Sequence, residues 1–96
     1  MLDSNTLKTI KKIVNPHLPN ELYKAFIFGS RVTGNNRTFS DIDLGIIGPN
    51  SIPSKNYMEM VDELEESDIP YRTDVVDFAS VSDKFKKRAL AKIIEL

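Results

Sequence analysis

The stretch GSRVTGNNRTFSDIDLGII, residues 29–47, carries the features on which the fold prediction rests. It begins with Gly29-Ser30, and after ten further residues it reaches the acidic pair Asp41 and Asp43. From Asp41 onward the residues favour a β-strand. Because side chains alternate along a strand, the two aspartates project to the same face. Carboxylates gathered on one face repel each other, so the pattern indicates a cation site, and Mg²⁺ is the ion that such hard oxygen ligands favour.

The segment before this stretch also predicts a strand. Leu22–Phe28 is a compact run rich in aromatic and β-favouring residues, and it ends at Gly29. A tight turn after a strand can direct backbone N–H groups at an anion. Glycine permits close approach of a phosphate, and the Ser30 hydroxyl adds a donor. The turn is therefore a candidate phosphate site.

The remaining segments alternate between helical and strand patterns. The first predicted element is a helix over 4–15, after the capping candidates Asp3 and Ser4. Strands follow over 22–28, 41–47 and 71–78, with a helix from Pro53 through Leu64. A last helix starts at Ser82 or Asp83, and its Phe85, Ala89, Ile93 and Ile94 share a face. The order predicts an α/β (α+β) fold, a small mixed sheet of at least three strands flanked by helices. We see no repeat or composition shift, so residues 1–96 are expected to form a single domain.

Composition narrows the classes of function. Thirteen basic and fourteen acidic residues give a net charge of -1, so no strong positive field attracts nucleic acid or a membrane. The chain has no cysteine, which excludes disulfides and thiolate chemistry and fits the cytoplasm. No window approaches the ~20 apolar residues that a membrane span needs.

Taken together, Gly-Ser, ten residues and Asp-x-Asp resemble the signature of the DNA polymerase β-like nucleotidyltransferase superfamily. Arg31, Gly34 and the serine before the acidic pair extend the resemblance to its minimal nucleotidyltransferase (MNT) branch, including MntA-like antitoxins. From ordinary residue frequencies the spacing arises in a chain this short on the order of once in a thousand.

The resemblance implies a third carboxylate on a later strand, where the segment YRTDVVDF offers Asp74 and Asp77. Their separation of three puts them on opposite faces of one strand. Asp74 is the better match, because it stands at the start of its strand as Asp41 does and follows a basic residue and a spacer. Asp77 remains the alternative.

The resemblance also implies a function. Asp41, Asp43 and Asp74 would be the catalytic and metal-binding residues of a two-ion Mg²⁺ site, with ATP held by Gly29, Ser30 and Arg31. The reaction would transfer AMP from ATP to a hydroxyl acceptor. For the MNT branch this implies a toxin–antitoxin role, in which a tyrosine of a HEPN-domain toxin accepts the nucleotide.

Two other classes of function compete. The chain could be a catalytically idle binding module that acts by contact with its partner. The joint presence of three carboxylates argues against this reading, because an idle module would tolerate the loss of any of them. It could also be a structural α/β domain without a nucleotide. His17, between two prolines, is expected on a surface loop. The KFKKR run at 84–88 fits a solvated helix face better than an RNA contact, and homo- or hetero-oligomers stay open.

Overall fold

A computed structural model describes residues 2–29, 32 and 41–96 of the chain. Four of its strands form one sheet in the order β3-β2-β1-β4. The elements are α1 (Ser4–Val14), the 3-10 turn η1 (Asn15–His17), β1 (Lys24–Phe28), β2 (Ile42–Ile47), α3 (Ser54–Glu66), β3 (Thr73–Asp77), the 3-10 turn η2 (Phe78–Ser80), α4 (Asp83–Ala89) and β4 (Ile94–Glu95).

The sheet is mixed, as the sequence predicts. β1 runs antiparallel to β2 and to β4, whereas β2 runs parallel to β3. The antiparallel β1–β2 pair follows directly along the chain, but the parallel β2–β3 pair needs a crossover, and α3 provides it. The β3 strand is therefore one edge of the sheet and β4 the other.

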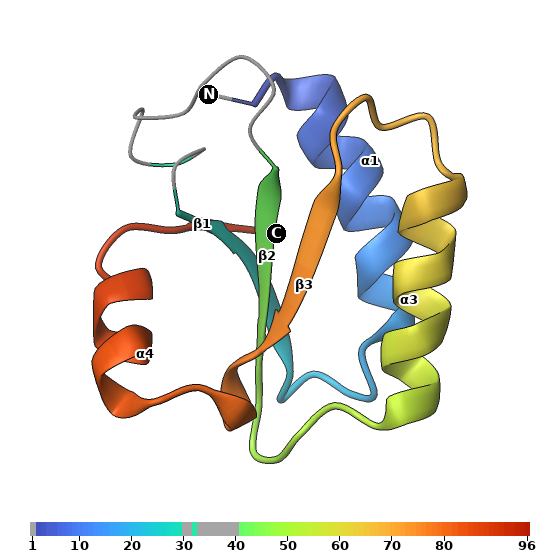
Figure 1. Cartoon of the computed structure of the whole chain (residues 1–96). Helices are drawn as coiled ribbons and strands as arrows, with labels where there is room; N and C mark the ends of the chain where they lie inside the picture. The colour runs from blue at the N-terminus through green and yellow to red at the C-terminus, as the bar shows by residue number, and fades with distance from the viewer. Residues whose placement is uncertain (1, 30–31, 33–40) are drawn as a thin grey trace.

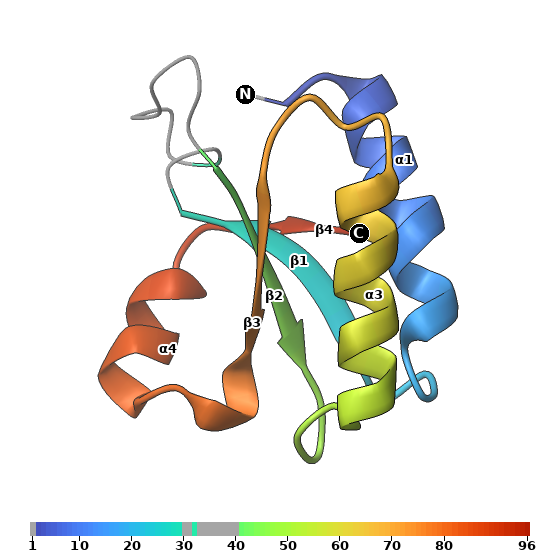
Figure 2. The same cartoon turned by 45° about the vertical axis from the view of Figure 1, so that its right-hand side comes forward.

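Helices cover both faces of the sheet (Figure 1). Figure 2 shows α1 and α3 side by side against one face and α4 on the opposite side. The face under α1 and α3 holds the larger core, where Ile27 from β1 and Leu44 from β2 are fully buried. The alternation of strand side chains explains why neighbouring residues of one strand supply both cores.

The opposite face holds an aromatic core. Phe26 and Phe28 of β1 pack on Phe78 of η2, with ring centroids 4.9 and 5.3 Å from that of Phe78 in edge-on arrangements. Gly45 of β2 makes room for these rings, because a Cβ at this position would lie 2.4 Å from Phe26 and 2.8 Å from Phe78. The glycine in this strand is thus a packing requirement.

Short polar side chains begin two of the helices, as the sequence predicts. The Asp3 carboxylate accepts a 2.7 Å hydrogen bond from the Thr6 N–H at the start of α1. The Ser82 hydroxyl accepts one from the Phe85 N–H, at 3.1 Å, and so caps α4. Each cap satisfies a backbone donor that the helix itself leaves open.

The predicted last helix is wrong in its second half. α4 ends at Ala89, and Ile94 lies in β4, opposite Ile27 of β1. Ile93 packs with the aromatic core and Ile94 with the larger core, so the two isoleucines occupy opposite faces of the sheet rather than one helix face. The open edge of β1 explains the change, since pairing it satisfies backbone groups that a longer helix would leave unpaired.

His17 does not lie on a surface loop as predicted. It belongs to η1, and its side chain is only 17% exposed between two glutamates of α3. Its Nδ1 lies 3.8 Å from Glu59 and its Nε2 lies 3.6 Å from Glu63. The Asn56 side chain also donates to the His17 carbonyl at 2.8 Å. These contacts join η1 to α3.

The aromatic core gives a test of the fold. Phe78→Ala should lower the free energy of unfolding by about 3–5 kcal/mol, because Phe78 is 2% exposed and its loss leaves a cavity. Phe85→Ala is the control, since Phe85 is 41% exposed and its removal should cost much less. Urea denaturation followed by circular dichroism measures both, and equal losses would contradict the described packing.

Candidate active site

The ends of three adjacent strands meet at one acidic position of the sheet. Asp43 of β2 lies opposite Phe28 of β1 and beside Asp74 of β3 in the parallel register. Residues side by side in a sheet point to the same face, so the two carboxylates lie next to each other. This face is the one that carries the aromatic core, since Phe28 belongs to that core.

Asp41 is exposed and lies next to the start of the same strand. It comes directly before β2, two residues from Asp43, so it points to the same face. The adjoining Ile42 N–H donates a 2.8 Å hydrogen bond to the carbonyl of Arg72, which precedes β3. This bond ties the starts of the two parallel strands together next to the carboxylates.

Asp43 is the electrostatic centre of the cluster. Burial raises the pKa of its carboxyl group above the ordinary value of 3.8, and the negative charges of Asp74 and Asp41 raise the pKa further, in that order. A raised pKa means that the folded protein disfavours the charged form of this group. Burial and charge repulsion thus destabilise the ionised cluster, and a cation between the carboxylates would offset this effect.

Position 29, next to Asp43, requires a glycine. It has a φ of +78°, in the left-handed region that favours glycine, and a Cβ at this position would lie 2.4 Å from the Asp43 carboxylate. The Val32 N–H donates to the Gly29 carbonyl at 3.0 Å, which closes the predicted turn after β1. The sequence suggested Gly29 for phosphate approach, whereas its direct contact with Asp43 could not be read from the sequence.

Two predicted phosphate ligands, Ser30 and Arg31, lie outside the described residues, as does Arg37 of the same motif stretch. Arg72, a basic residue near the acidic cluster, is described. It is exposed and lies directly before β3, two residues from Asp74.

Asp77 lies away from the acidic cluster. It is in register with Ile46, near the other end of β2. Its carboxylate accepts hydrogen bonds from the Ile52 N–H at 3.3 Å and the Ala79 N–H at 3.0 Å. Asp77 therefore holds two turns in place, and of the two candidates only Asp74 lies beside Asp43.

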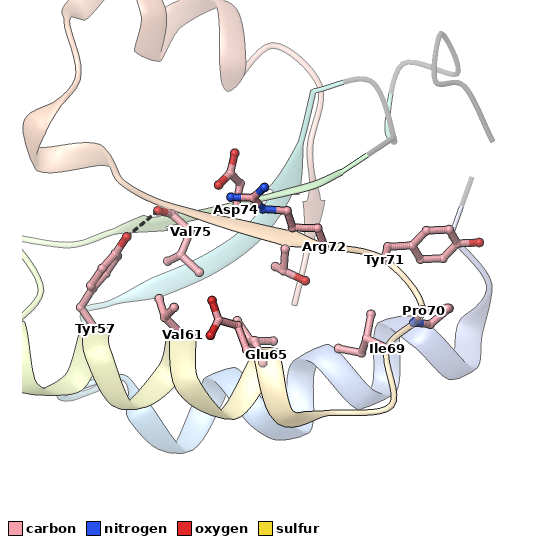
Figure 3. Close-up of a pocket in the computed structure, with 11 residues that line it drawn as sticks. Tyr57, Val61, Glu65, Ile69, Pro70, Tyr71, Arg72, Asp74 and Val75 are labelled. Carbon is pink, nitrogen blue, oxygen red and sulfur yellow. Dashed lines mark hydrogen bonds between the residues drawn. The ribbon is translucent and has the colours of Figure 1, made fainter. Parts of the chain in front are cut away.

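A groove of about 440 Å³ lies beside the cluster, between α3 and the edge strand β3. Figure 3 shows Tyr57, Val61 and Glu65 rising from α3 toward β3, with Asp74 on the other side of the strand. The Tyr57 hydroxyl donates to the Val75 carbonyl at 3.2 Å and crosses one end of the groove. The groove could not be predicted from the sequence, because only the crossover of α3 over the sheet creates it.

The carboxylates fit a hard divalent cation. Their oxygens are the ligands that Mg²⁺ prefers, and Mg²⁺ commonly binds through one or two carboxylates together with substrate phosphates. Within residues 2–29, 32 and 41–96, no three acidic or histidine side chains form a ready-made metal cage. Asp43 and Asp74 thus supply oxygen ligands of the kind that such an ion uses.

The fold and the acidic cluster define a nucleotidyltransferase. The family described as "Polymerase beta, Nucleotidyltransferase" matches residues 8–96, and the chain belongs to this family. It is similar to "Probable protein adenylyltransferase MntA" of Haemophilus influenzae, with 33% identity over 86 residues that cover 90% of this chain and 74% of that protein. This similarity supports the MntA-like branch that the motifs indicated.

Solved structures share the fold. A crystal structure of a toxin-antitoxin with AMP-PNP matches with a TM-score of 0.67 and 20% identity, over 98% of this chain and 72% of that chain. A structure of tri-AMPylated Shewanella oneidensis HEPN toxin in complex with MNT antitoxin matches with a TM-score of 0.70 and 18% identity, over 98% and 71%. At these identities the likeness establishes the fold alone.

No helix among the described residues combines the length and the apolar character that crossing a membrane requires.

Stability should depend on pH through Asp43. Because its folded-state pKa is raised, its contribution to stability is fully present below its ordinary pKa of 3.8 and is lost as the pH rises through the raised value. Asp43→Asn removes that charge, so without divalent cations we expect the variant to be more stable than wild type at pH 7. The two proteins should converge as the pH falls toward 4.

Urea denaturation at several pH values between 4 and 8 measures this difference. A difference between wild type and Asp43→Asn that is independent of pH, or that grows toward low pH, would contradict the electrostatic account. Asp62→Asn is a suitable control, because Asp62 is an exposed acidic residue of α3.

Proposed function

We propose that the chain is a Mg²⁺-dependent adenylyltransferase that moves AMP from ATP to a hydroxyl group of a partner protein. The observation that carries the proposal is the adjacent pair Asp43 and Asp74, joined by Asp41 on the same face. A cluster of carboxylates beside a glycine turn suits a metal-bound triphosphate. The name of the Haemophilus influenzae relative and the AMP-PNP in a structural neighbour support ATP as the donor.

The reaction is an in-line substitution at the α-phosphorus of ATP. The acceptor oxygen forms a bond to that phosphorus while the bond to the bridging oxygen breaks, and pyrophosphate leaves. Asp74 takes the proton of the acceptor hydroxyl. The Gly29 turn, with Ser30 and Arg31, holds the phosphates, so this chain contributes mainly positioning and charge neutralisation.

The carboxylates of Asp41, Asp43 and Asp74 would hold Mg²⁺, in a two-ion arrangement. When bound, such ions stabilise the attacking oxygen and the leaving oxygen of the substitution. The raised pKa of Asp43 fits this role, because burial and the negative charges of Asp74 and Asp41 disfavour the ionised carboxylate, and a divalent cation would offset this effect.

The acceptor is proposed to be a tyrosine of a HEPN-domain toxin, which makes this chain an antitoxin that acts by modification. The support is the similarity to MntA and the HEPN toxin complex among the structural neighbours. The pair would work in the cytoplasm, as the absence of cysteine suggests. Residues 1–96 would act as one domain and obtain substrate recognition from the partner.

Mg²⁺ and a nucleotide should stabilise the protein together. A ligand at 100 times its Kd stabilises the folded state by about 2.7 kcal/mol, a Tm rise on the order of 10 °C for a domain this small. We expect this rise for wild type with Mg²⁺ and ATP, a smaller one with the other three nucleoside triphosphates, and none after EDTA. Differential scanning fluorimetry measures it.

The double variant Asp41→Ala/Asp43→Ala should lose this ligand-induced rise, whatever its own Tm. If no triphosphate stabilises wild type, the idle binding module becomes the better explanation, since such a module needs no nucleotide. The partner must then be added before the nucleotide site can be dismissed.

Asp74 and Asp77 should differ in their effect on transfer. Asp74→Asn should lower the rate on the order of 10²–10⁴-fold, the usual contribution of a general base. Asp77→Asn should retain the rate, because Asp77 lies away from the acidic cluster, although the amide oxygen can accept only one of the two turn hydrogen bonds. Transfer of label from [α-³²P]ATP to a HEPN-domain protein of the same organism measures both, and loss in Asp77→Asn alone would reverse the assignment.

A further inference from the structure

We infer that an extended segment of the acceptor protein binds as an added strand along the outer edge of β3, with its tyrosine on the Asp74 face. The inference rests on the proposed function for the identity of the occupant. The docking edge itself consists of the backbone of β3 and the groove between β3 and α3. Binding of this kind uses main-chain hydrogen bonds for affinity and alternate side chains for specificity.

The outer edge of β3 presents main-chain groups that β2 does not use. The Ile42 N–H of β2 donates to the Arg72 carbonyl, so the main-chain groups of Arg72 face β2. Because these groups alternate in direction along a strand, the main-chain groups of Asp74 face β2 as well. The backbone groups of Thr73 and Val75 then point outward. The hydrogen bond from the Tyr57 hydroxyl to the Val75 carbonyl comes from this outer side and agrees with the alternation. Among the described residues, no strand pairs with this edge.

Tyr57 limits where a strand can be added. Its hydroxyl occupies the outward carbonyl of Val75, at the middle of β3. The Thr73 N–H and C=O, together with the Val75 N–H, are the outward groups nearer the start of the strand. The open part of the edge therefore flanks Asp74, the carboxylate that faces the acceptor hydroxyl in the proposed reaction.

The two faces of an added strand would meet different surroundings. Side chains facing α3 would enter the groove, where Val61, Leu64 and Ile69 provide apolar contacts. Side chains on the opposite face would lie beside Asp74, at the cross-strand distance of about 4.5–5.5 Å between Cβ atoms. The acceptor tyrosine must then be flanked on each side by apolar residues that fill the groove.

Charge favours a basic segment. The second half of α3 carries Asp62, Glu63, Glu65 and Glu66, and its last turn has no basic residue. Glu65 lines the groove itself, as does Asp74, whereas Arg72 is the one basic residue among the lining side chains. An acceptor segment with lysine or arginine outside its apolar positions complements this surface.

Hydrogen exchange tests the docking edge. The probe is a ten-residue peptide with one central tyrosine, valine or leucine on each side of it, and lysines beyond. The peptide should slow exchange of the outward amides of Thr73 and Val75, whereas the amides of Asp74 and Val76 are already bonded to β2. NMR of the ¹⁵N-labelled protein resolves these amides, and absence of protection at Thr73 and Val75 at millimolar peptide would overturn the inference.

Peptide register provides a second test. A matched peptide of the same composition exchanges the tyrosine with a neighbouring apolar residue, which turns the tyrosine toward the groove. With ATP and Mg²⁺, the first peptide should accept AMP with a kcat/KM about tenfold or more above the shifted one, the size of a charge or fit mismatch in an apolar pocket. Equal transfer to both peptides would overturn the inference and leave the proposed function intact.

Two variants of α3 separate docking from chemistry. Val61→Glu puts a charge into the groove, whereas Met58→Glu makes the same change on the same helix at a side chain that is 63% exposed and does not line the groove. We expect Val61→Glu to raise the KM for the peptide about tenfold, with the KM for ATP unchanged. Met58→Glu should change neither value.

The outcomes distinguish the two proposals. Amide protection without transfer to any acceptor would keep the docking edge and defeat the proposed function. Protection of Thr73 and Val75 without peptide, together with a dimer in sedimentation, would assign the edge to a second copy of this chain and overturn the inference.

Discussion

The parallel pairing of β2 with β3 is the constraint on which the site depends. It puts Asp74 beside Asp43, although the two residues are separated along the chain by the whole of α3. A one-residue slip would turn Asp74 to the face covered by α1 and α3 and would bring Thr73 or Val75 to the acidic position. The fully buried Ile42 and Leu44 oppose such a slip, because it would disturb the larger core along with the site. Burial of these apolar side chains thus also maintains the register that brings Asp74 beside Asp43.

The same pairing lowers the stability of the folded protein at the site. Burial and two neighbouring charges disfavour the ionised form of Asp43, and Gly29 approaches its carboxylate closely from the β1 side. No side chain at position 29 could be accommodated without moving Asp43. The fold keeps these groups together through the aromatic core on the same face, where Phe28 is both the register partner of Asp43 and a neighbour of Phe78. Preorganised charge of this kind is useful only when a ligand compensates for it.

The sequence predicted the elements that have local causes. Runs of aromatic and β-favouring residues identified β1, β2 and β3, and the capping side chains of Asp3 and Ser82 correctly marked helix starts. It also put Asp41 and Asp43 on one face. What it could not supply was long-range pairing: the order of the strands, the register that brings Asp74 to Asp43, and the groove that α3 forms with β3. The error at Ile93 and Ile94 has the same origin, because their helical spacing was overridden by the unpaired edge of β1.

The pairing of β4 with β1 has a consequence for synthesis on the ribosome. Phe26 pairs with Glu95 and Ile27 with Ile94, so the central strand finds one of its two neighbours almost at the opposite end of the sequence. Contacts between such distant positions slow folding, because a long loop must close before they form. The nascent chain can build β1, β2 and β3 early, yet one side of β1 stays open until residues 94–95 emerge. During that interval the exposed strand edge is open to pairing with other chains, which makes closure by β4 part of producing the folded protein.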